Sequence, residues 1–228
     1  EIVSALFSTA FNWGIFSESE EGTEIKDLMT PGTTTVLDIS VYSSTSAFNV
    51  RALVISLISK KIFQKRMDAR KKEELESLRH GQDYLSYKSE RTEPLVWIFI
   101  DEAHEFLPKE GKTPATDALI QLLREGRQPG ISVVLATQQP GQIHKDVMTQ
   151  ADLVISHRLT AKPDIEALNE IMQSYLLKNI KQEIDELSSA KGSAILLDDN
   201  SERIYPMRVR PKFTWHGGEA PTSVKAEF

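Results

Sequence analysis

Runs of apolar residues along this chain alternate between two spacings, one typical of buried strands and one typical of amphipathic helices. From Val50, apolar residues recur every three or four positions as far as Ile62, which predicts a long amphipathic helix. The uninterrupted run Leu95 to Ile100 (LVWIFI) predicts a central parallel strand covered on both faces. The same reasoning predicts further strands at 33–40, 131–136 and 152–156, helices at 113–125, 163–173 and around 180–187, and a terminal strand pair at 192–197 and 203–209.

The helix over 113–125 has clear start and stop signals. Thr113 can cap it, Pro114 suits its first turn, and Gly126 can end it. We expect its buried stripe to consist of four small or branched apolar residues, Ala115, Ala118, Leu119 and Leu122. Strands that alternate with such helices predict an α/β fold with a doubly wound, mostly parallel sheet, followed by the terminal strand pair and a tail.

Charge divides the chain into regions. Residues 1–24 form an N-terminal remnant with an acidic connection, 25–210 an α/β core, and 211–228 a C-terminal tail without periodicity. Within the core, a basic helical extension is predicted at about 60–92. It opens with seven basic residues against one acidic residue, Asp68: Lys60, Lys61, Lys65, Arg66, Arg70, Lys71 and Lys72. Such a run is either a solvated helix face, the interpretation we favour, or an arm that contacts phosphates.

Composition narrows the function classes. The chain has 228 residues, a net charge of −6 and no cysteine. The charge argues against bulk electrostatic adhesion to nucleic acid, and the missing cysteines exclude disulfides and thiolate metal sites. The apolar runs are far shorter than the ~18 residues of a membrane-spanning helix. A cytoplasmic protein without a membrane anchor is the prediction.

Two consecutive carboxylates, Asp101 and Glu102, follow the predicted central strand. This position is the carboxyl edge of the sheet, where open α/β folds bind ligands. Hydrolysis of a nucleoside triphosphate needs such a pair, since one acid holds Mg²⁺ and the other orients the attacking water. The alternative is a strand that merely ends in polar residues.

Neighbouring segments favour the hydrolytic interpretation. The next predicted strand ends in Ala-Thr-Gln-Gln-Pro, which places Gln138 beside the carboxylates as a polar sensor. Arg127 follows the helix that begins just beyond them, so its loop is expected near the same edge. Otherwise it is a helix-end cation of minor energetic effect. His104 is expected to be structural, because the five histidines lack the spacing of a metal site.

The ordered segments VWIFIDEAHEFLP, LLREGRQPGISVVLATQQP and ADLVISHRLTAKPDIEAL resemble the second half of the motor domain of HerA-type hexameric DNA translocases, within the HerA/FtsK group of RecA-like ATPases. The resemblance implies that Asp101 is the magnesium-associated acid, Glu102 the catalytic glutamate and Gln138 a nucleotide sensor. It also implies that Arg127 is an arginine finger, and it extends to Arg158 in the segment SHRL. ATP and Mg²⁺, duplex DNA, a hexameric ring and a NurA-type nuclease partner are implied likewise.

One element of that family pattern is missing from the sequence. The phosphate-binding motif Gly-x-x-x-x-Gly-Lys-Ser/Thr does not occur in the sequence. The core is therefore expected to be truncated, without the strand that leads into this motif. Gly111-Lys112-Thr113 lacks the first glycine, and we expect Lys112 to be an exposed loop lysine. Three alternatives to a translocase stay open: a non-catalytic oligomerisation or scaffold module, a superfamily-two helicase of the DEAH type, and a conjugation or chromosome-segregation motor.

Overall fold

The computed structural model describes residues 16–17, 22–42, 49–79, 93–172, 184, 187–188 and 190–214. The helices among them are α2 (Ile25–Leu28), α3 (Val50–Arg79), α4 (Thr116–Glu125), α5 (Lys145–Gln150) and α6 (Lys162–Met172), with short 3-10 helices η1 (Ala103–Glu105) and η2 (Pro140–Gln142). The strands are β1 (Val96–Ile100), β2 (Ile131–Leu135), β3 (Leu153–His157), β4 (Ser193–Asp198) and β5 (Arg203–Arg208).

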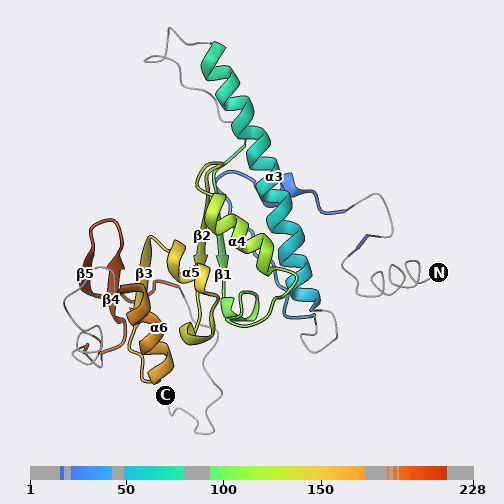
Figure 1. The fold of residues 1–228 in the computed structure, drawn as a ribbon. Coiled ribbons are helices and arrows are strands. Elements are labelled where there is room, and N and C mark those ends of the chain that lie inside the picture. Colours follow the sequence, from blue (N-terminus) through green and yellow to red (C-terminus); the bar gives the residue numbers. More distant parts are fainter. Residues whose placement is uncertain are drawn as a thin grey trace, which may run out of the picture.

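The first sheet consists of β1 and β2, which are parallel and joined by α4. Val96 pairs with Ile131 and Ile100 pairs with Leu135, so the two strands are in register along their length. Helices α3 and α4 lie side by side along one face of this pair (Figure 1). Alternate strand residues, including Ile98 and Val133, pack beneath them in the main core. All four residues expected to form the inner stripe of 113–125 are buried, as predicted.

Helix α3 is the long amphipathic helix that the apolar spacing predicted. It begins after Asn49, whose side-chain Oδ1 accepts a hydrogen bond from the Ala52 amide at 3.0 Å and caps the first turn. The last turns of α3 extend beyond the sheet (Figure 1). The helix runs without interruption to Arg79, so it includes the whole basic run.

A second sheet, with the order β3-β4-β5, lies apart from the first and is antiparallel throughout. The terminal strand pair is confirmed as β4 and β5, where Ser193 pairs with Arg208. Strand β3 was expected to extend the parallel sheet, but it pairs antiparallel with β4, Val154 facing Leu197. Its own small core, which includes Leu168 and Ile195, explains this pairing. The result is an α/β protein with a parallel sheet and a separate antiparallel one.

The prediction of a strand at 33–40 is wrong. The segment has no ladder partner among the described residues and forms local hydrogen bonds instead, as from Thr33 Oγ1 to the Thr30 carbonyl at 2.7 Å. Val36 is 85% exposed. β-branched composition favours a strand only where a neighbouring strand and a packed face receive it.

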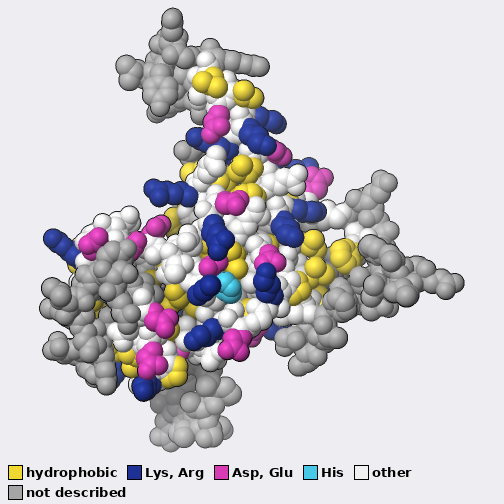
Figure 2. All heavy atoms as spheres, viewed as in Figure 1, with side chains coloured by type: hydrophobic (Ala, Val, Ile, Leu, Met, Phe, Trp, Pro, Cys, Tyr) yellow, Lys and Arg dark blue, Asp and Glu magenta, His cyan; other side chains and the backbone are white. Residues whose placement is uncertain are grey.

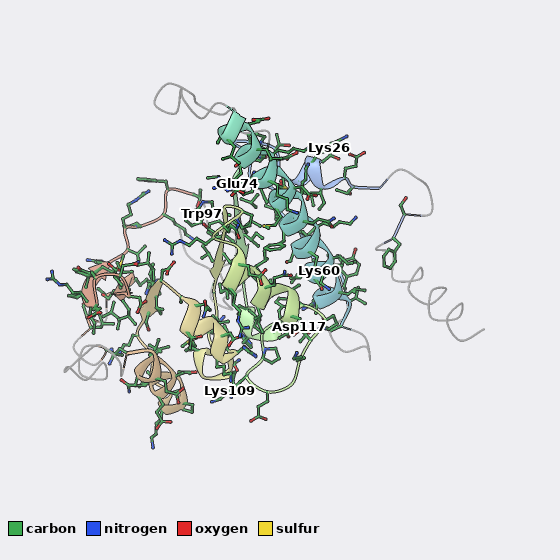
Figure 3. The ribbon with its side chains drawn as sticks, turned by 45° about the horizontal axis from the view of Figure 1, so that its top comes forward. Lys26, Lys60, Glu74, Trp97, Lys109 and Asp117 are labelled. Atoms are coloured by element: carbon green, nitrogen blue, oxygen red, sulfur yellow. The ribbon has the colours of Figure 1, made fainter. Side chains whose placement is uncertain are left out.

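The second face of the parallel pair is bare in the described part of the chain. Trp97 and Phe99 of β1 are stacked at 6.2 Å between ring centroids and are largely exposed. Figure 3 shows Trp97 on the side of β1 away from α3. The sequence predicted that both faces of β1 are covered, but in the described residues only the face beneath α3 and α4 is. Most of the helix predicted around 180–187 and most of the tail lie outside the described residues.

Candidate functional site

The ends of β1 and β2 bring together the polar residues that the sequence singled out. Beyond the last ladder pair, the Ala136 amide donates to the Ile100 carbonyl and the Ala103 amide donates to the Ala136 carbonyl, both at 2.9 Å. These two bonds hold the segments that follow the strands against each other. Asp101 and Glu102 therefore lie beside Thr137 and Gln138 at the carboxyl edge, as predicted.

Glu102 is held in an unusual conformation. Its backbone lies in the left-handed region (φ 47°, ψ 46°), which costs a residue with a side chain about 1–2 kcal/mol. The Gln138 side-chain amide donates to Glu102 Oε1 at 2.7 Å. The other carboxylate oxygen, Oε2, is buried and accepts no hydrogen bond within the described residues. Backbone strain and an unsatisfied buried acceptor on one residue are typical of functional sites.

His104 belongs to the same cluster, which the sequence did not indicate. Its Nδ1 lies 2.9 Å from Thr137 Oγ1 and 3.5 Å from Glu102 Oε2, and its side chain is mostly buried. The hydrogen bond agrees with the expected structural role, but it places the imidazole against the free carboxylate oxygen. The available signal was that His104 and Thr137 each come a few residues after the ends of adjacent parallel strands.

Asp101 is exposed at this edge. Its Oδ1 accepts a hydrogen bond from the Glu102 amide at 2.9 Å. A solvent-facing carboxylate is the hard oxygen donor that Mg²⁺ prefers, so Asp101 fits the predicted role chemically. No group of three or more acidic or histidine side chains that could hold a metal ion gathers in the described ranges.

Arg127 lies at the opposite edge of the sheet, which corrects the expectation. The Val96 amide, at the start of β1, donates to the Gly130 carbonyl at 3.2 Å, so the 126–130 loop adjoins the amino ends of the strands. The reason is topological: α4 connects two parallel strands and must run antiparallel to them. Five strand residues at ~3.3 Å each separate the two edges by roughly 16 Å. Arg127 is exposed and lies away from Asp101 and Glu102.

Arg158 follows β3 directly and is exposed. The link that contains it leads to α6, where Asp164 Oδ1 accepts a hydrogen bond from the Gly141 amide at 2.9 Å. Gly141 is in η2, shortly after Gln138 in the chain. The segment of Arg158 is thereby tied to the loop that follows the carboxyl edge of β2.

The Gly111-Lys112-Thr113 segment is not a phosphate cradle. Lys112 is an exposed loop lysine, as predicted, and its Nζ lies 2.7 Å from Asp117 Oδ1. This hydrogen bond, together with the charge of Lys112, lowers the pKa of Asp117. The Thr113 hydroxyl donates to the Phe106 carbonyl at 2.8 Å and is already occupied.

Neither interpretation of the basic run describes all of its members. Lys60, Lys61, Lys71 and Lys72 are exposed, but Arg66 is fully buried, and Lys65 lies 3.3 Å from Glu93. Basic and acidic side chains are intermixed on the face drawn in Figure 2. The run therefore combines a solvated face with an internal structural residue. No helix in the described ranges is long and apolar enough to cross a membrane.

Comparisons with known proteins show similarity in fold and in sequence. The fold is similar to that of the genome packaging NTPase B204 from Sulfolobus turreted icosahedral virus 2, with a TM-score of 0.51 and 18% identity over 82% of this chain and 72% of that one. In sequence, the chain is 25% identical over 185 residues to the DNA double-strand break repair helicase HerA of Pyrococcus furiosus, covering 73% of this chain. It is 32% identical over 92 residues, 39% of this chain, to a probable HerA of Methanocaldococcus jannaschii.

The fold and these relatives define the class: the chain has the RecA-like α/β fold of a HerA-type ATPase. Within that class, residues 46–162 match the zonular occludens toxin (Zot) family, and the chain belongs to it. The two alignments with the HerA relatives cover only 31% of the length of the Pyrococcus protein and 18% of the length of the Methanocaldococcus protein.

Proposed function

We propose that this chain supplies the hydrolytic carboxylates and the arginine finger of an ATP-driven DNA translocase that works as a ring. The observation that carries the proposal is the state of Glu102. A carboxylate at the carboxyl edge of a parallel strand, held in a strained backbone conformation and oriented by the Gln138 amide, is suited to act as a general base.

Under this proposal, the residues at the carboxyl edge have separate roles in ATP hydrolysis. Water attacks the γ-phosphorus, its proton passes to the Glu102 carboxylate, and the bond between the phosphorus and the bridging oxygen of the ADP leaving group breaks. Gln138 donates to Glu102 Oε1 and thereby fixes the orientation of the carboxylate. Asp101 is the residue to hold Mg²⁺, which when bound would neutralise charge on the phosphates.

The position of Arg127 supports action on a neighbouring subunit. Roughly 16 Å of strand separate it from Glu102 of its own chain, by the rise of a β-strand. In a ring whose subunits pack one edge against the next, Arg127 would reach the nucleotide held by its neighbour and stabilise the charge that develops there. Arg158, in the link after β3, is proposed as an auxiliary contact of the same site.

The substrate and partners follow from the relatives. The HerA relatives are named as DNA double-strand break repair helicases, and B204 is named as a genome packaging NTPase. We propose duplex DNA as the substrate of this chain, a hexameric ring as its assembly, and a NurA-type nuclease as its partner in DNA end processing. A cytoplasmic location is part of the same proposal.

The test uses Glu102→Gln in the full natural protein, with Glu105→Gln as the matched control. Glu105 lies in the adjacent η1 and pairs with Arg51 on the protein surface, so its substitution removes a carboxylate without touching the proposed base. Nucleotide binding should survive in both variants, while turnover of Glu102→Gln alone should fall by about 10³-fold or more. Normal turnover in Glu102→Gln would contradict the role of Glu102 and favour a non-catalytic module.

A further inference from the structure

A buried arginine in α3 holds the loop that contains Arg127. Arg66 is 1% exposed, although the basic run that contains it includes exposed lysines such as Lys61 and Lys71. Its Nε donates to the Pro129 carbonyl at 2.8 Å, and its Nη1 donates to the Glu93 carbonyl at 2.7 Å. The same Nη1 lies 3.4 Å from Glu73 Oε1, further along α3. One guanidinium therefore joins α3 to the loop before β2 and to the segment that enters β1.

The loop itself is tightly constrained at both ends. Gly130 has φ 79°, and a Cβ at this position would lie 2.4 Å from Leu95 Cδ2. A Cβ at Gly126 would lie 2.4 Å from the Leu122 carbonyl oxygen. Glycine is favoured at 126 by contact with the Leu122 backbone and at 130 by the positive φ, so both ends of the loop have a defined conformation. Pro129 lies between these ends, and its carbonyl is the point where Arg66 attaches.

The chemistry of these contacts requires arginine. A planar guanidinium can direct separate N–H donors to two carbonyl groups and a carboxylate at the same time, which the single ammonium of lysine cannot reproduce in that geometry. Removing a buried ion pair is often neutral for stability when the cavity is refilled, so stability alone is a weak explanation for Arg66. The contacts instead fix where the loop sits.

We propose that Arg66 is a positioning residue for Arg127, and that α3 presents the arginine loop to the neighbouring subunit through it. This inference rests on the proposed action of Arg127 across a subunit boundary. It gives α3 a part in hydrolysis although the basic part of the helix lies away from the carboxylates. A change in the position of α3 would move Arg127 with it, because Pro129 belongs to the same short loop.

The experiment compares Arg66→Gln and Arg66→Lys with Arg70→Gln in the full natural protein. Arg70 is a matched control, since it also pairs with Glu73 on the same helix but is 44% exposed and contacts no loop carbonyl in the described structure. The Arg66 variants should lower kcat by roughly 10- to 100-fold at unchanged KM, because a displacement of about 1 Å at a catalytic group has effects of this size. Arg70→Gln should keep normal turnover, and so should Arg66→Gln if the proposal is wrong.

Mixed rings separate a positioning role from a general structural one. An Arg66→Gln subunit keeps Glu102 but presents Arg127 poorly, so activity should return when it is mixed with Glu102→Gln subunits. It should not return on mixing with Arg127→Ala subunits, because every site would then face an impaired arginine. If Arg127→Ala is rescued by Glu102→Gln and Arg66→Gln is not, Arg66 does not act through Arg127. If neither is rescued in confirmed mixed rings, the proposed action of Arg127 fails as well.

Amide hydrogen exchange of Arg66→Lys gives a readout independent of turnover. The amides of Gly130 and Ile131 are bonded within the loop, to the carbonyls of Arg127 and Gly126. They should exchange faster in the variant, and so should the Val96 amide that is bonded to the Gly130 carbonyl, while amides later in β1 are unchanged. Equal exchange in the loop, or faster exchange throughout the protein, would overturn the positioning role.

Discussion

Glu102 offers a direct test of whether the proposed base is held under backbone strain. The structure places it at φ 47° and ψ 46°, and this conformation is left-handed. Substitution by glycine relieves the strain, whereas substitution by alanine keeps it. Both remove the same carboxylate and the same hydrogen bond from Gln138, so the difference between the two variants isolates the backbone.

The expected difference can be worked out from two opposing terms. A left-handed conformation costs a residue with a Cβ about 1–2 kcal/mol relative to glycine. Glycine also lowers the free energy of unfolding by about 0.4–1 kcal/mol relative to alanine, because the unfolded chain has more conformational freedom at a glycine. Glu102→Gly should therefore be the more stable variant by about 1 kcal/mol, which for a chain of this size corresponds to a Tm higher by roughly 2–4 °C.

Thermal unfolding followed by circular dichroism measures this difference, with the same two substitutions at Glu105 as the control. Glu105 is not among the described residues with positive φ. There the order should reverse, with glycine less stable than alanine by about 0.5–1 kcal/mol. If Glu102→Ala is as stable as Glu102→Gly while Glu105 behaves as expected, the strained geometry, and with it the argument for a poised base, is wrong.

Two further predictions concern nucleotide and DNA. Residues 1–228 alone should hydrolyse ATP at the background rate, because carboxylates and an arginine cannot hold a triphosphate without a cradle of amides and a lysine; robust Mg²⁺-dependent turnover by the purified chain would refute this. If the exposed part of the basic run binds DNA, reversing Lys61, Lys71 and Lys72 should weaken binding to all sequences and flatten its salt dependence, by up to about one unit of slope for each phosphate that the variant no longer neutralises. Arg66 is left intact in that variant, and an unchanged slope would assign the run to the solvated face.

The sequence predicted what depends on local pattern. The strands at 96–100 and 131–135, the helix that connects them and the carboxylates at the strand end follow from apolar runs and stop signals, and the structure has them at or within a few residues of the expected positions. Gln138 was also predicted correctly beside Glu102, because neighbouring parallel strands end at the same edge. These features require no knowledge of distant contacts.

Long-range contacts explain what the sequence missed. Arg66 looks like any other member of a basic run, and only its partners in other parts of the chain show that it is internal. The strand at 33–40 needed a neighbour that the described residues do not provide. The edge assigned to Arg127 was a different kind of error, since the direction of a helix between two parallel strands already fixes it.

The corrected position of Arg127 strengthens the link between hydrolysis and assembly. Had the arginine been at the carboxyl edge, a single subunit could in principle have completed its own site, and a ring would have been optional. With the carboxylates at one end of the strands and the arginine at the other, the proposed roles give one chain two half-sites that face opposite ways. Two such halves meet only when subunits pack head to tail, which is the heterologous contact that closes into rings. Under the proposed roles, an isolated subunit cannot hydrolyse ATP efficiently even when it binds nucleotide. Arg66, which fixes the arginine half to α3, then controls how well neighbouring halves meet.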